Sequence, residues 1–262
     1  MKYRRAAVTL KSAQDIEIMR VAASTTAEIL DEVAISVVPG VTTWDLDRIA
    51  EEACRRRGVT PAFRGLYGFP SSLCVALNEV VVHGIPSRSV VLQEGDILGL
   101  DFGVVHKGWY GDHARTLTVG QVDSESVALI ETTRRALVAG IEACQPGNRL
   151  RDVGKAVEEC ARLGGYAVVR DFVGHGIGRR LHEEPGVYNY FDRLQMMRLQ
   201  PGMVLCVEPM VNAGTAKVAV LEDQWTAVTA DGRRSAHFEH TVAITVSGPE
   251  VLSQPGWGVE AA

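Results

Sequence analysis

The sequence lacks the features that would mark a secreted, membrane-bound or disulfide-rich protein. Its five cysteines are an odd number with no CxxC pair, which argues against a disulfide framework or a zinc knuckle and for free thiols in a reducing compartment. No run of about 18 apolar residues occurs, and residues 1–19 lack the apolar core of a signal peptide. We therefore expect a soluble, cytoplasmic protein.

A strong excess of charge is absent as well. The formal net charge is −5, and the basic stretches at residues 55–57 and 233–234 are short, so nothing indicates binding to nucleic acid or to an anionic membrane. No long exposed apolar stripe demands a partner, and we expect a monomer. No linker or low-complexity segment divides the 262 residues, of which 46% are apolar. A single domain over residues 1–262 is therefore predicted, without an N-terminal extension domain.

Hydrophobic periodicity predicts helix pairs that alternate with strands. Apolar residues at helical spacing indicate helices over residues 12–35, 43–58, 125–144 and 151–163, the first capped by Ser12 with Asp15 three positions later. Short apolar stretches between turn signals indicate strands over residues 72–82, 96–105, 109–119, 166–173, 203–208, 217–222 and 237–246. The order of these elements predicts an α+β fold.

The second helix pair repeats the first. A shift of 107 residues aligns three features of one pair with those of the other. They are a Pro-Gly break (39–40 and 146–147), an aspartate (45 and 152) and a terminal glycine (58 and 165). Chance similarity between amphipathic helices is the alternative explanation. Because the offset stays constant without a gap, we favour a duplicated helix–helix–strand unit, with halves of about residues 12–120 and 121–250 and a cleft at their junction.

Two aspartates occur in one apolar hairpin, where an unpaired buried carboxylate costs several kcal/mol. Asp101 follows the apolar run 97–100, and Asp112 comes eleven residues later. If residues 107 and 108 form the turn, both carboxylates share one face, whereas His113 points away. Two carboxylates that lie so near each other share either a proton or cations. The alternative is one ion-paired aspartate and one exposed turn aspartate.

Three more potential metal ligands occur at predicted strands further along the chain. His175 lies between two glycines, whose backbone freedom lets an imidazole approach a metal closely. Glu208 ends a strand before Pro209, and Glu239 lies within a later strand. Taken alone, each fits an ordinary loop or edge position better than a ligand position. Together with the two aspartates they form an oxygen-rich set with one nitrogen, which suits two bridged divalent ions such as Mn, Fe(II), Co or Zn.

Five sequence blocks carry a specific resemblance. They are NEVVVHGIP (78–86), LDF…YGDHART (100–116), GHGIG…LHEEP (174–185), VEPMV (207–211) and FEHT (238–241). These blocks resemble the signature blocks of methionine aminopeptidases, and they occur in the same order and at the spacing of the type I enzymes. The match extends from about residue 12 to residue 252. It implies the α+β pita-bread fold, in which two pseudo-symmetric helix–helix–strand halves surround a curved antiparallel sheet and a dinuclear metal site.

The resemblance implies a role for each ligand. Asp101 is expected to be a terminal ligand, Asp112 and Glu239 to bridge the ions, and His175 and Glu208 to complete the second ion's ligands. The expected reaction is attack on the first peptide bond by water held between two divalent ions, which lower the pKa of that water. The implied activity is metal-dependent removal of the initiator methionine from proteins and peptides with a small second residue.

The resemblance also implies catalytic and substrate-binding residues. Glu208 is expected to move protons from the water to the leaving amine, and His83 and His182 to position the scissile amide and stabilise the tetrahedral intermediate. Without the family blocks, both histidines would be read as ordinary core or loop residues. The positions that match the family's methionine pocket are Leu66, Phe69, Cys74, Leu181 and Trp225, where core packing is the alternative.

Four residues depart from the family pattern. Leu66 and Leu181 stand where aromatic residues are common, which predicts weaker discrimination of methionine from norleucine and leucine. His113 replaces a threonine and faces away from the metals, so no catalytic role is expected. His237 replaces a glutamine on the face of Glu239. Our hypothesis is that it makes activity or metal affinity pH-dependent near neutrality.

Two other functions fit the same residues less well. An Xaa-Pro aminopeptidase or prolidase shares this fold and these five ligands, but typically carries a separate N-terminal domain. Only 33 residues separate His175 from Glu208, which leaves no room for the helical insertion of type II methionine aminopeptidases. A non-catalytic pita-bread protein would bind partners or RNA, but such proteins lose ligands. The partners expected here are N-termini of nascent polypeptides, with docking on the ribosome left open, and neither nucleic acid nor membrane.

Overall fold

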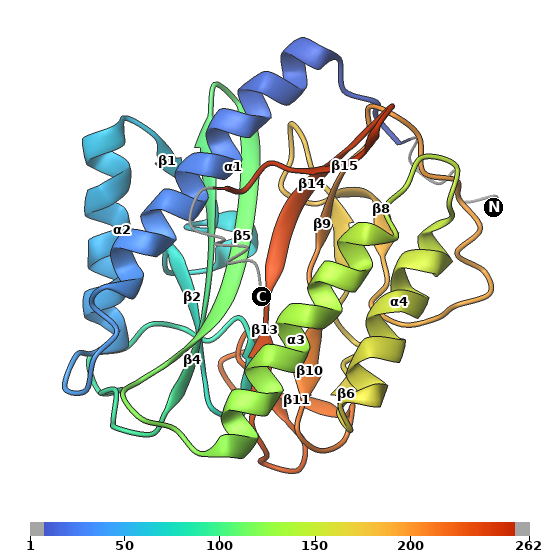
Figure 1. The fold of residues 1–262 in the computed structure, drawn as a ribbon. Helices are drawn as coiled ribbons and strands as arrows, with labels where there is room; N and C mark the ends of the chain where they lie inside the picture. The colour runs from blue at the N-terminus through green and yellow to red at the C-terminus, as the bar shows by residue number, and fades with distance from the viewer. Residues whose placement is uncertain (1–7, 255–262) are drawn as a thin grey trace.

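The structure is a computed structural model that describes residues 8–254. In this part of the chain, four long helices pack on a curved sheet: α1 (Ala13–Ala34), α2 (Thr43–Arg57), α3 (Ser124–Glu142) and α4 (Leu150–Leu163). Figure 1 shows α1 and α2 over one half of the sheet and α3 and α4 over the other. The four predicted helices are confirmed within two residues at either end, and the α+β class with them.

The helix boundaries follow from local capping chemistry. The Ser12 hydroxyl accepts a hydrogen bond from the backbone N–H of Asp15, and the carboxylate of Asp15 accepts one from the backbone N–H of Ser12. Thr42 and Asp45 do the same at α2. Each pair satisfies two of the backbone N–H groups that a helix start leaves free. Gly58 ends α2 in the left-handed conformation, with φ of 65°.

The main sheet contains nine strands in the order β1-β4-β5-β14-β9-β7-β8, with β2 on β4 and β15 on β14. Every pairing in it is antiparallel. Its strands are β1 (Thr60–Pro61), β2 (Leu73–Leu77), β4 (Ile97–His106), β5 (Trp109–Thr118), β7 (Gly174–Gly176), β8 (Glu183–Val187), β9 (Val204–Val207), β14 (Glu239–Thr245) and β15 (Gly248–Val251).

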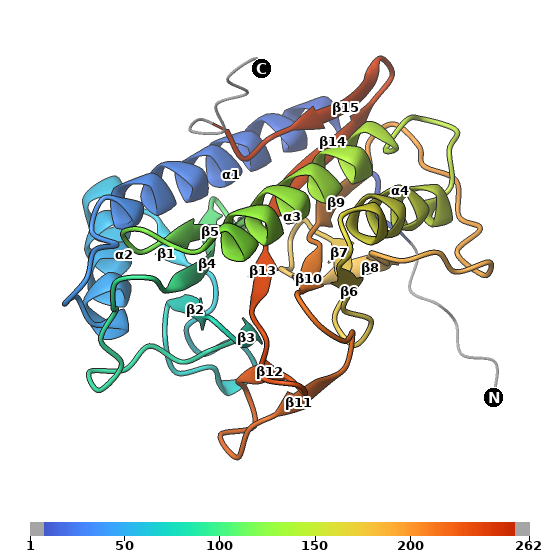
Figure 2. The same ribbon diagram turned by 60° about the horizontal axis from the view of Figure 1, so that its bottom comes forward.

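Two small sheets complete the fold. One has the order β13-β10-β6 and the other the order β11-β12-β3. The second lies on the side of the main sheet away from the helices (Figure 2). Their strands are β3 (Val80–Val82), β6 (Ala167–Val168), β10 (Met210–Asn212), β11 (Val218–Val220), β12 (Ala227–Thr229) and β13 (Ser235–His237).

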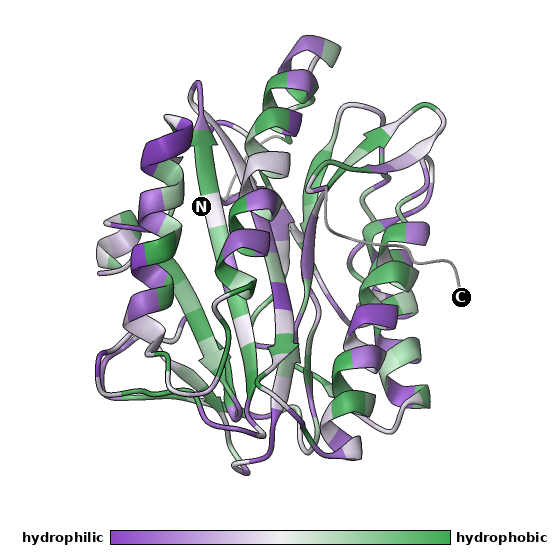
Figure 3. Ribbon diagram, turned by 60° about the vertical axis from the view of Figure 1, so that its left-hand side comes forward, coloured by the Kyte–Doolittle hydropathy of each residue, from purple (hydrophilic) through white to green (hydrophobic). Residues whose placement is uncertain are grey.

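The helices cover one face of the main sheet, which leaves the other face free for a site. In Figure 3 purple and green alternate around each helix, whereas the long strands are largely green or white. Gly111 of β5 faces α1 so closely that a Cβ there would lie 2.4 Å from the backbone nitrogen of Ala23. Because successive residues of a strand face opposite sides, Asp112 points away from α1. Within residues 8–254, no helix has both the length and the apolar character needed to cross a bilayer.

Three predicted strands differ from the structure. Residues 72–82 form two strands, because Asn78 turns the chain with φ of 52° and its side chain contacts Asp96 and the backbone of Ile97. Residues 237–246 are divided at Phe238, where the chain passes from the β13-β10-β6 sheet into the main sheet. Of residues 166–173, only the two residues of β6 pair.

Candidate active site

The hairpin of β4 and β5 places two carboxylates on the free face of the sheet. Asp101 pairs with Ala114, and Gly103 pairs with Asp112, so both aspartates have the predicted parity. Ala114 also pairs with Glu239, the first residue of β14, on its other side. One alanine therefore lies between two acidic residues of neighbouring strands, which brings Asp101, Asp112 and Glu239 together.

The adjacent strands β9 and β7 add Glu208 and His175. Glu208 follows β9 directly, and His175 pairs with Cys206 of the same strand. The Nδ1 of His175 lies 2.9 Å from the carbonyl of Gly176, to which it can donate. Its Nε2 faces the carboxylates, 3.4 Å from Glu208 Oε1 and 3.8 Å from Asp112 Oδ2.

The clustered carboxylates lack partners that would offset the free-energy cost of burying them. One oxygen each of Asp101, Glu208 and Glu239 is buried without any hydrogen-bond partner. In residues 8–254, the ion-pairing contacts of the cluster come from His175 and His237 and from no lysine or arginine. Burial and mutual repulsion raise the pKa values of Asp112, Glu208 and Glu239 well above their usual range.

The donor set fits divalent metal ions. Burial lowers the pKa of His175 to about 3, so the imidazole is neutral and supplies a nitrogen ligand but no compensating charge. Ligand atoms of Asp112, His175 and Glu239 lie within 4.8 Å of one another, together with that of Cys206. A divalent cation coordinates buried oxygen and nitrogen donors whose electron pairs have no hydrogen-bond partner. Its charge would also offset the repulsion between the carboxylates.

Cys206 is a member of this group that sequence reasoning missed. Its side chain is fully buried, and its sulfur lies 3.9 Å from the hydroxyl of Thr241. In the sequence the thiol looks like one more apolar residue of a strand. The available signal was its spacing of two from Glu208, which places both side chains on the same face of β9.

The predicted histidines stand around the carboxylates. His83 packs edge-on against Phe172, and His182 packs edge-on against His175, with ring centroids 4.5 Å apart. Burial lowers the pKa of His83 to about 4, so it is neutral at physiological pH. His182 is stacked against Tyr67, an exposed residue with φ of 51° that sequence reasoning also missed.

His113 and His237 have the predicted orientations, but His237 does not have the predicted titration. His113 lies on the opposite face from Asp112, where its ring stacks on that of His240. His237 Nε2 lies 4.0 Å from Glu208 Oε2. The structure argues against a His237 that makes activity or metal affinity pH-dependent near neutrality, because burial lowers its pKa to about 3, assisted by the neighbouring His83 and His113.

All twelve residues predicted for the site line one cavity of about 630 Å³. The carboxylates and His175 form its polar part. Phe69 and Trp225 meet edge to face at 5.2 Å between ring centroids and form an apolar part with three further residues. The residues that line the cavity as predicted are Leu66, Phe69, Cys74, His83, Asp101, Asp112, His175, Leu181, His182, Glu208, Trp225 and Glu239.

This geometry defines a class of metal-dependent hydrolase, and comparison with known proteins identifies the family. The sequence model of metallopeptidase family M24 matches residues 17–246, and the chain belongs to this family. Within it the chain is one of the methionine aminopeptidases, the metallo-aminopeptidases to which its relatives belong. It is 47% identical to methionine aminopeptidase of Clostridium perfringens over 94% of this chain and 98% of that protein. It is 42% identical to methionine aminopeptidase 1 of Bacillus subtilis over 94% of this chain and 99% of that protein.

Solved structures agree on the fold. The crystal structure of methionine aminopeptidase from Thermotoga maritima has a TM-score of 0.93 and 43% identity, over 95% of this chain and 100% of that one. The pita-bread fold expected from the sequence is thereby confirmed. An Xaa-Pro dipeptidase from Bacillus anthracis has a TM-score of 0.74 and 24% identity, over 94% of this chain and 62% of that one. At this identity the likeness shows only the shared fold.

Proposed function

We propose that this chain removes the N-terminal methionine from polypeptides whose second residue is small, by hydrolysing the first peptide bond at a dinuclear metal centre. The observation that carries the proposal is the meeting of two parts in one cavity, a buried carboxylate cluster and an apolar slot. The first supplies the ligands of a hydrolytic centre, and the second is suited to an unbranched apolar side chain. The partners would be N-termini of nascent chains in the cytoplasm, and neither nucleic acid nor membrane.

Five residues would hold two divalent ions such as Mn, Fe(II), Co or Zn: Asp101, Asp112, His175, Glu208 and Glu239. When bound, these ions would lower the pKa of water and polarise the peptide carbonyl. The orientation of Asp112 and Glu239 toward a common point, with Asp101 on one side and His175 on the other, supports bridging roles for these two carboxylates.

Glu208 is the residue we propose to move protons. Its Oε1 is buried without a hydrogen-bond partner, and burial together with the charges of Asp112 and Asp101 raises the pKa of its carboxyl group. A carboxyl group with a raised pKa accepts a proton readily and can pass it to the leaving amine. Because Glu208 also lines the cavity, its proton is within reach of a bound substrate.

His83 and His182 would orient the scissile amide from two sides. Both line the cavity, and both have lowered pKa values because of burial. A neutral imidazole can donate one hydrogen bond toward the carbonyl oxygen and accept another from the amide, without adding charge to the metal centre. The ring of His182 is held between Tyr67 and His175, which limits its orientation.

The apolar slot would accept the methionine side chain. Phe69, Cys74 and Leu181 are buried, whereas Leu66 and Trp225 are partly buried at its edge. A polarizable thioether packs well against aromatic edges and a sulfur atom. Because two leucines replace larger aromatic residues, we expect the ratio of kcat/KM for methionine over norleucine to be small. Introducing Leu66→Tyr and Leu181→Phe should raise this ratio, and an unchanged ratio in both would contradict the prediction.

The test of the proposed function is the release of free amino acid from two peptides in the presence of Mn(II). The first is Met-Ala-Ser, and the second is Ala-Pro-Ser, whose second residue would suit an Xaa-Pro aminopeptidase. Release from the first alone is the expected result. Cleavage of only the proline peptide would transfer the assignment to that other branch of the family. No release from either peptide with any divalent metal would overturn the proposal.

A further inference from the structure

The cluster of potential metal-binding side chains contains a soft donor, a cysteine sulfur, that the proposed catalytic set does not use. The Sγ of Cys206 and single ligand atoms of Asp112, His175 and Glu239 all lie within 4.8 Å of one another. A second observation points to the same place, because Glu239 is 2% exposed and its Oε1 has no hydrogen-bond partner. The four residues thus form a buried group of one sulfur, one nitrogen and two oxygen donors.

The strand register fixes Cys206 within this group. Cys206 pairs with His175 of β7 on one side and with Thr241 of β14 on the other. The hydroxyl of Thr241 in turn exchanges hydrogen bonds with the backbone of Asp112, at 2.8 and 3.1 Å. Strands β7 and β9, together with β5 on the far side of β14, therefore hold the imidazole, the sulfur and the aspartate on one face of the sheet.

The geometry of the four donors suits a tetrahedral ion. At bond lengths of about 2.0–2.3 Å, tetrahedral ligand atoms lie about 3.3–3.8 Å apart. The observed limit of 4.8 Å is larger by about 1 Å, which small rotations of the carboxylates can remove. Four protein donors that include sulfur and nitrogen are typical of closed zinc sites, whereas oxygen-rich sets with open positions suit catalytic centres.

We propose that Cys206, Asp112, His175 and Glu239 form a second, closed site for a thiophilic divalent ion such as Zn²⁺ or Cd²⁺. The ion forms a bond to the sulfur, the thiol proton passes to solvent, and no electron is transferred. The site differs from the proposed catalytic arrangement in using Cys206 and in leaving Asp101 and Glu208 without the ion. An ion in this position takes both carboxylates that the catalytic arrangement would share.

The consequence for activity rests on the proposed function. Since Asp112 and Glu239 cannot serve both arrangements at once, a thiophilic ion inhibits the peptidase by occupying the closed site. Inhibition by Cd²⁺ or excess Zn²⁺ is then competitive with Mn(II). Removing the thiol should raise the inhibitory Cd²⁺ concentration by more than the about 10–100-fold that loss of a supporting group costs, because a ligand of the ion is lost.

The test is a Cd²⁺ titration of the full-length, reduced and metal-free protein, followed by the ultraviolet thiolate-to-metal charge-transfer band. The wild type should show a band that saturates at one equivalent, and Cys206→Ser should not. Cys74→Ser is the matched control, because Cys74 lines the same cavity next to Asp101 and should leave the band in place. If Cys206→Ser does not fold, Cys206→Ala serves the same purpose.

The outcomes separate this inference from the proposed function. A band that persists in the folded Cys206 variants, or that is absent from the wild type, overturns the closed site. A band that depends on Cys206 in a protein without activity on Met-Ala-Ser supports the closed site and contradicts the proposed function. Equal inhibition of the wild type and Cys206→Ser by Cd²⁺, with a Cys206-dependent band, overturns the competition between the two arrangements.

Discussion

At the scale of single residues, the carboxylates proposed to bind metal lower the stability of the metal-free fold. Asp112 is 3% exposed and lies close to other carboxylates without a lysine or arginine partner among the described residues. Without metal, this arrangement destabilises the fold, because like charges that are buried together repel. The residues that would bind metal are therefore also those whose replacement can stabilise the metal-free protein.

Replacing Asp112 with asparagine should separate these two effects. The variant should lose more than the about 10–100-fold in kcat/KM that removal of a supporting group costs, because a ligand is lost. In the metal-free protein, Asp112→Asn should raise Tm, by about 2–4 °C for each kcal/mol of repulsion removed. Thermal unfolding with and without Mn(II), beside the wild type, measures both. A lower Tm of the metal-free variant would contradict the repulsion argument.

A second residue-scale prediction concerns His237. Because burial lowers its pKa to about 3, the imidazole stays neutral throughout the range in which the enzyme is assayed. His237→Gln should therefore leave the shape of the kcat/KM profile between pH 6 and pH 8 unchanged, whatever its effect on the absolute rate. The comparison needs the two profiles under identical metal loading. A shoulder near pH 6.5 that disappears in the variant would show that His237 does titrate there.

The sequence predicted most of the site at this scale, for identifiable reasons. Alternation along a hairpin suffices to place Asp101 and Asp112 on one face, and the register confirms this. Alternation also places Cys206 on the face of Glu208, but its proximity to His175 and Thr241 depends on the register with two other strands, which alternation does not give. The depressed pKa of His237 likewise depends on how completely neighbouring elements bury it.

At the scale of secondary-structure elements, a buried ion pair holds the loop that carries His182. Lys11, which precedes α1, donates from Nζ to Glu183 Oε2 at 2.9 Å, and both side chains are less than a tenth exposed. The other oxygen of Glu183 accepts a hydrogen bond from the backbone of Arg180. The backbone of Lys11 is itself bound to the carbonyl of Gly202. The start of α1 thus fixes the residue next to His182.

Lys11→Met should therefore affect catalysis as well as stability. Loss of one partner leaves a buried charge unpaired, which costs about 3–5 kcal/mol, so Tm should fall. If the pair positions His182, kcat should fall while metal content stays that of the wild type. The double variant Lys11→Met with Glu183→Gln removes both charges and keeps an acceptor for Arg180. It should recover much of the Tm but little of kcat, because the contact that positions His182 is still missing, and recovery of both would contradict a positioning role.

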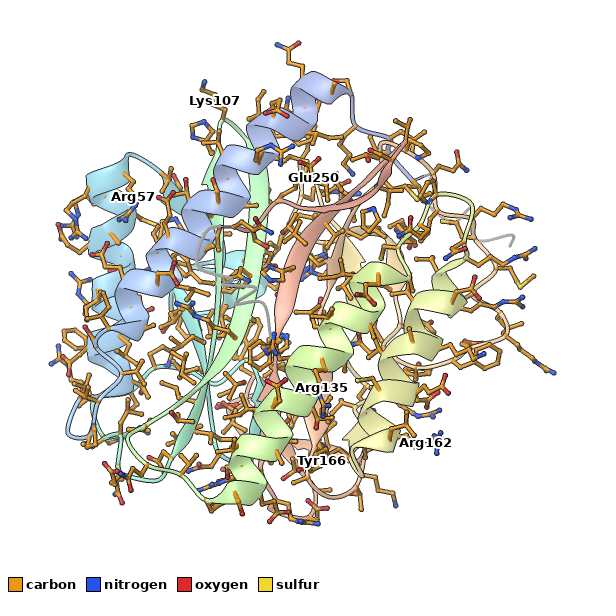
Figure 4. All side chains as sticks on the ribbon, in the orientation of Figure 1. Arg57, Lys107, Arg135, Arg162, Tyr166 and Glu250 are labelled. Atoms are coloured by element: carbon orange, nitrogen blue, oxygen red, sulfur yellow. The ribbon has the colours of Figure 1, made fainter. Side chains whose placement is uncertain are left out.

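Other contacts between elements show where sequence patterns stop being informative. The helices were predictable because capping residues and apolar spacing act within one segment. The strand expected over residues 72–82 has an unbroken apolar pattern, but a turn at Asn78 is fixed by contacts with Asp96. Across the surface, Glu250 of β15 lies beside α1 (Figure 4), where it forms an ion pair with Arg20 at 2.9 Å. Such pairings depend on segments far apart in the chain.

At the scale of the whole molecule, the offset of 107 residues recurs in backbone details. Isolated strand bridges join Thr42 to Val91 and Arg149 to Arg198, and the two bridges differ by 107 at both ends. Hydrogen bonds from Gly40 to Leu92 and from residue 147 to residue 199 follow the same offset. These matches support a duplicated unit. Asp101 and Asp112 fall within residues 12–120 and the other three proposed ligands within residues 121–250, so we propose that the site lies at the junction of two such units.

Buried histidines should make the stability of the whole molecule depend on pH. Burial lowers the pKa of His113 to about 4 in the folded protein, whereas an unfolded histidine has a pKa of about 6.5. The folded state thus disfavours protonation, so this stability is complete above about pH 6.5 and is lost as the pH falls toward 4. At pH 5 the loss from one such histidine is about 2 kcal/mol.

His113→Asn tests this dependence, because an asparagine amide can still donate to the carbonyl of Glu239, which the ring nitrogen contacts at 2.6 Å. The fall in Tm between pH 7 and pH 5 should be smaller in the variant by several degrees, since about 1 kcal/mol corresponds to about 2–4 °C in a chain of this size. Contributions shared by both proteins, including metal loss in acid, cancel in the comparison. Parallel Tm curves would mean that His113 is protonated as easily in the folded as in the unfolded protein, which its burial beside His240 of the neighbouring strand argues against.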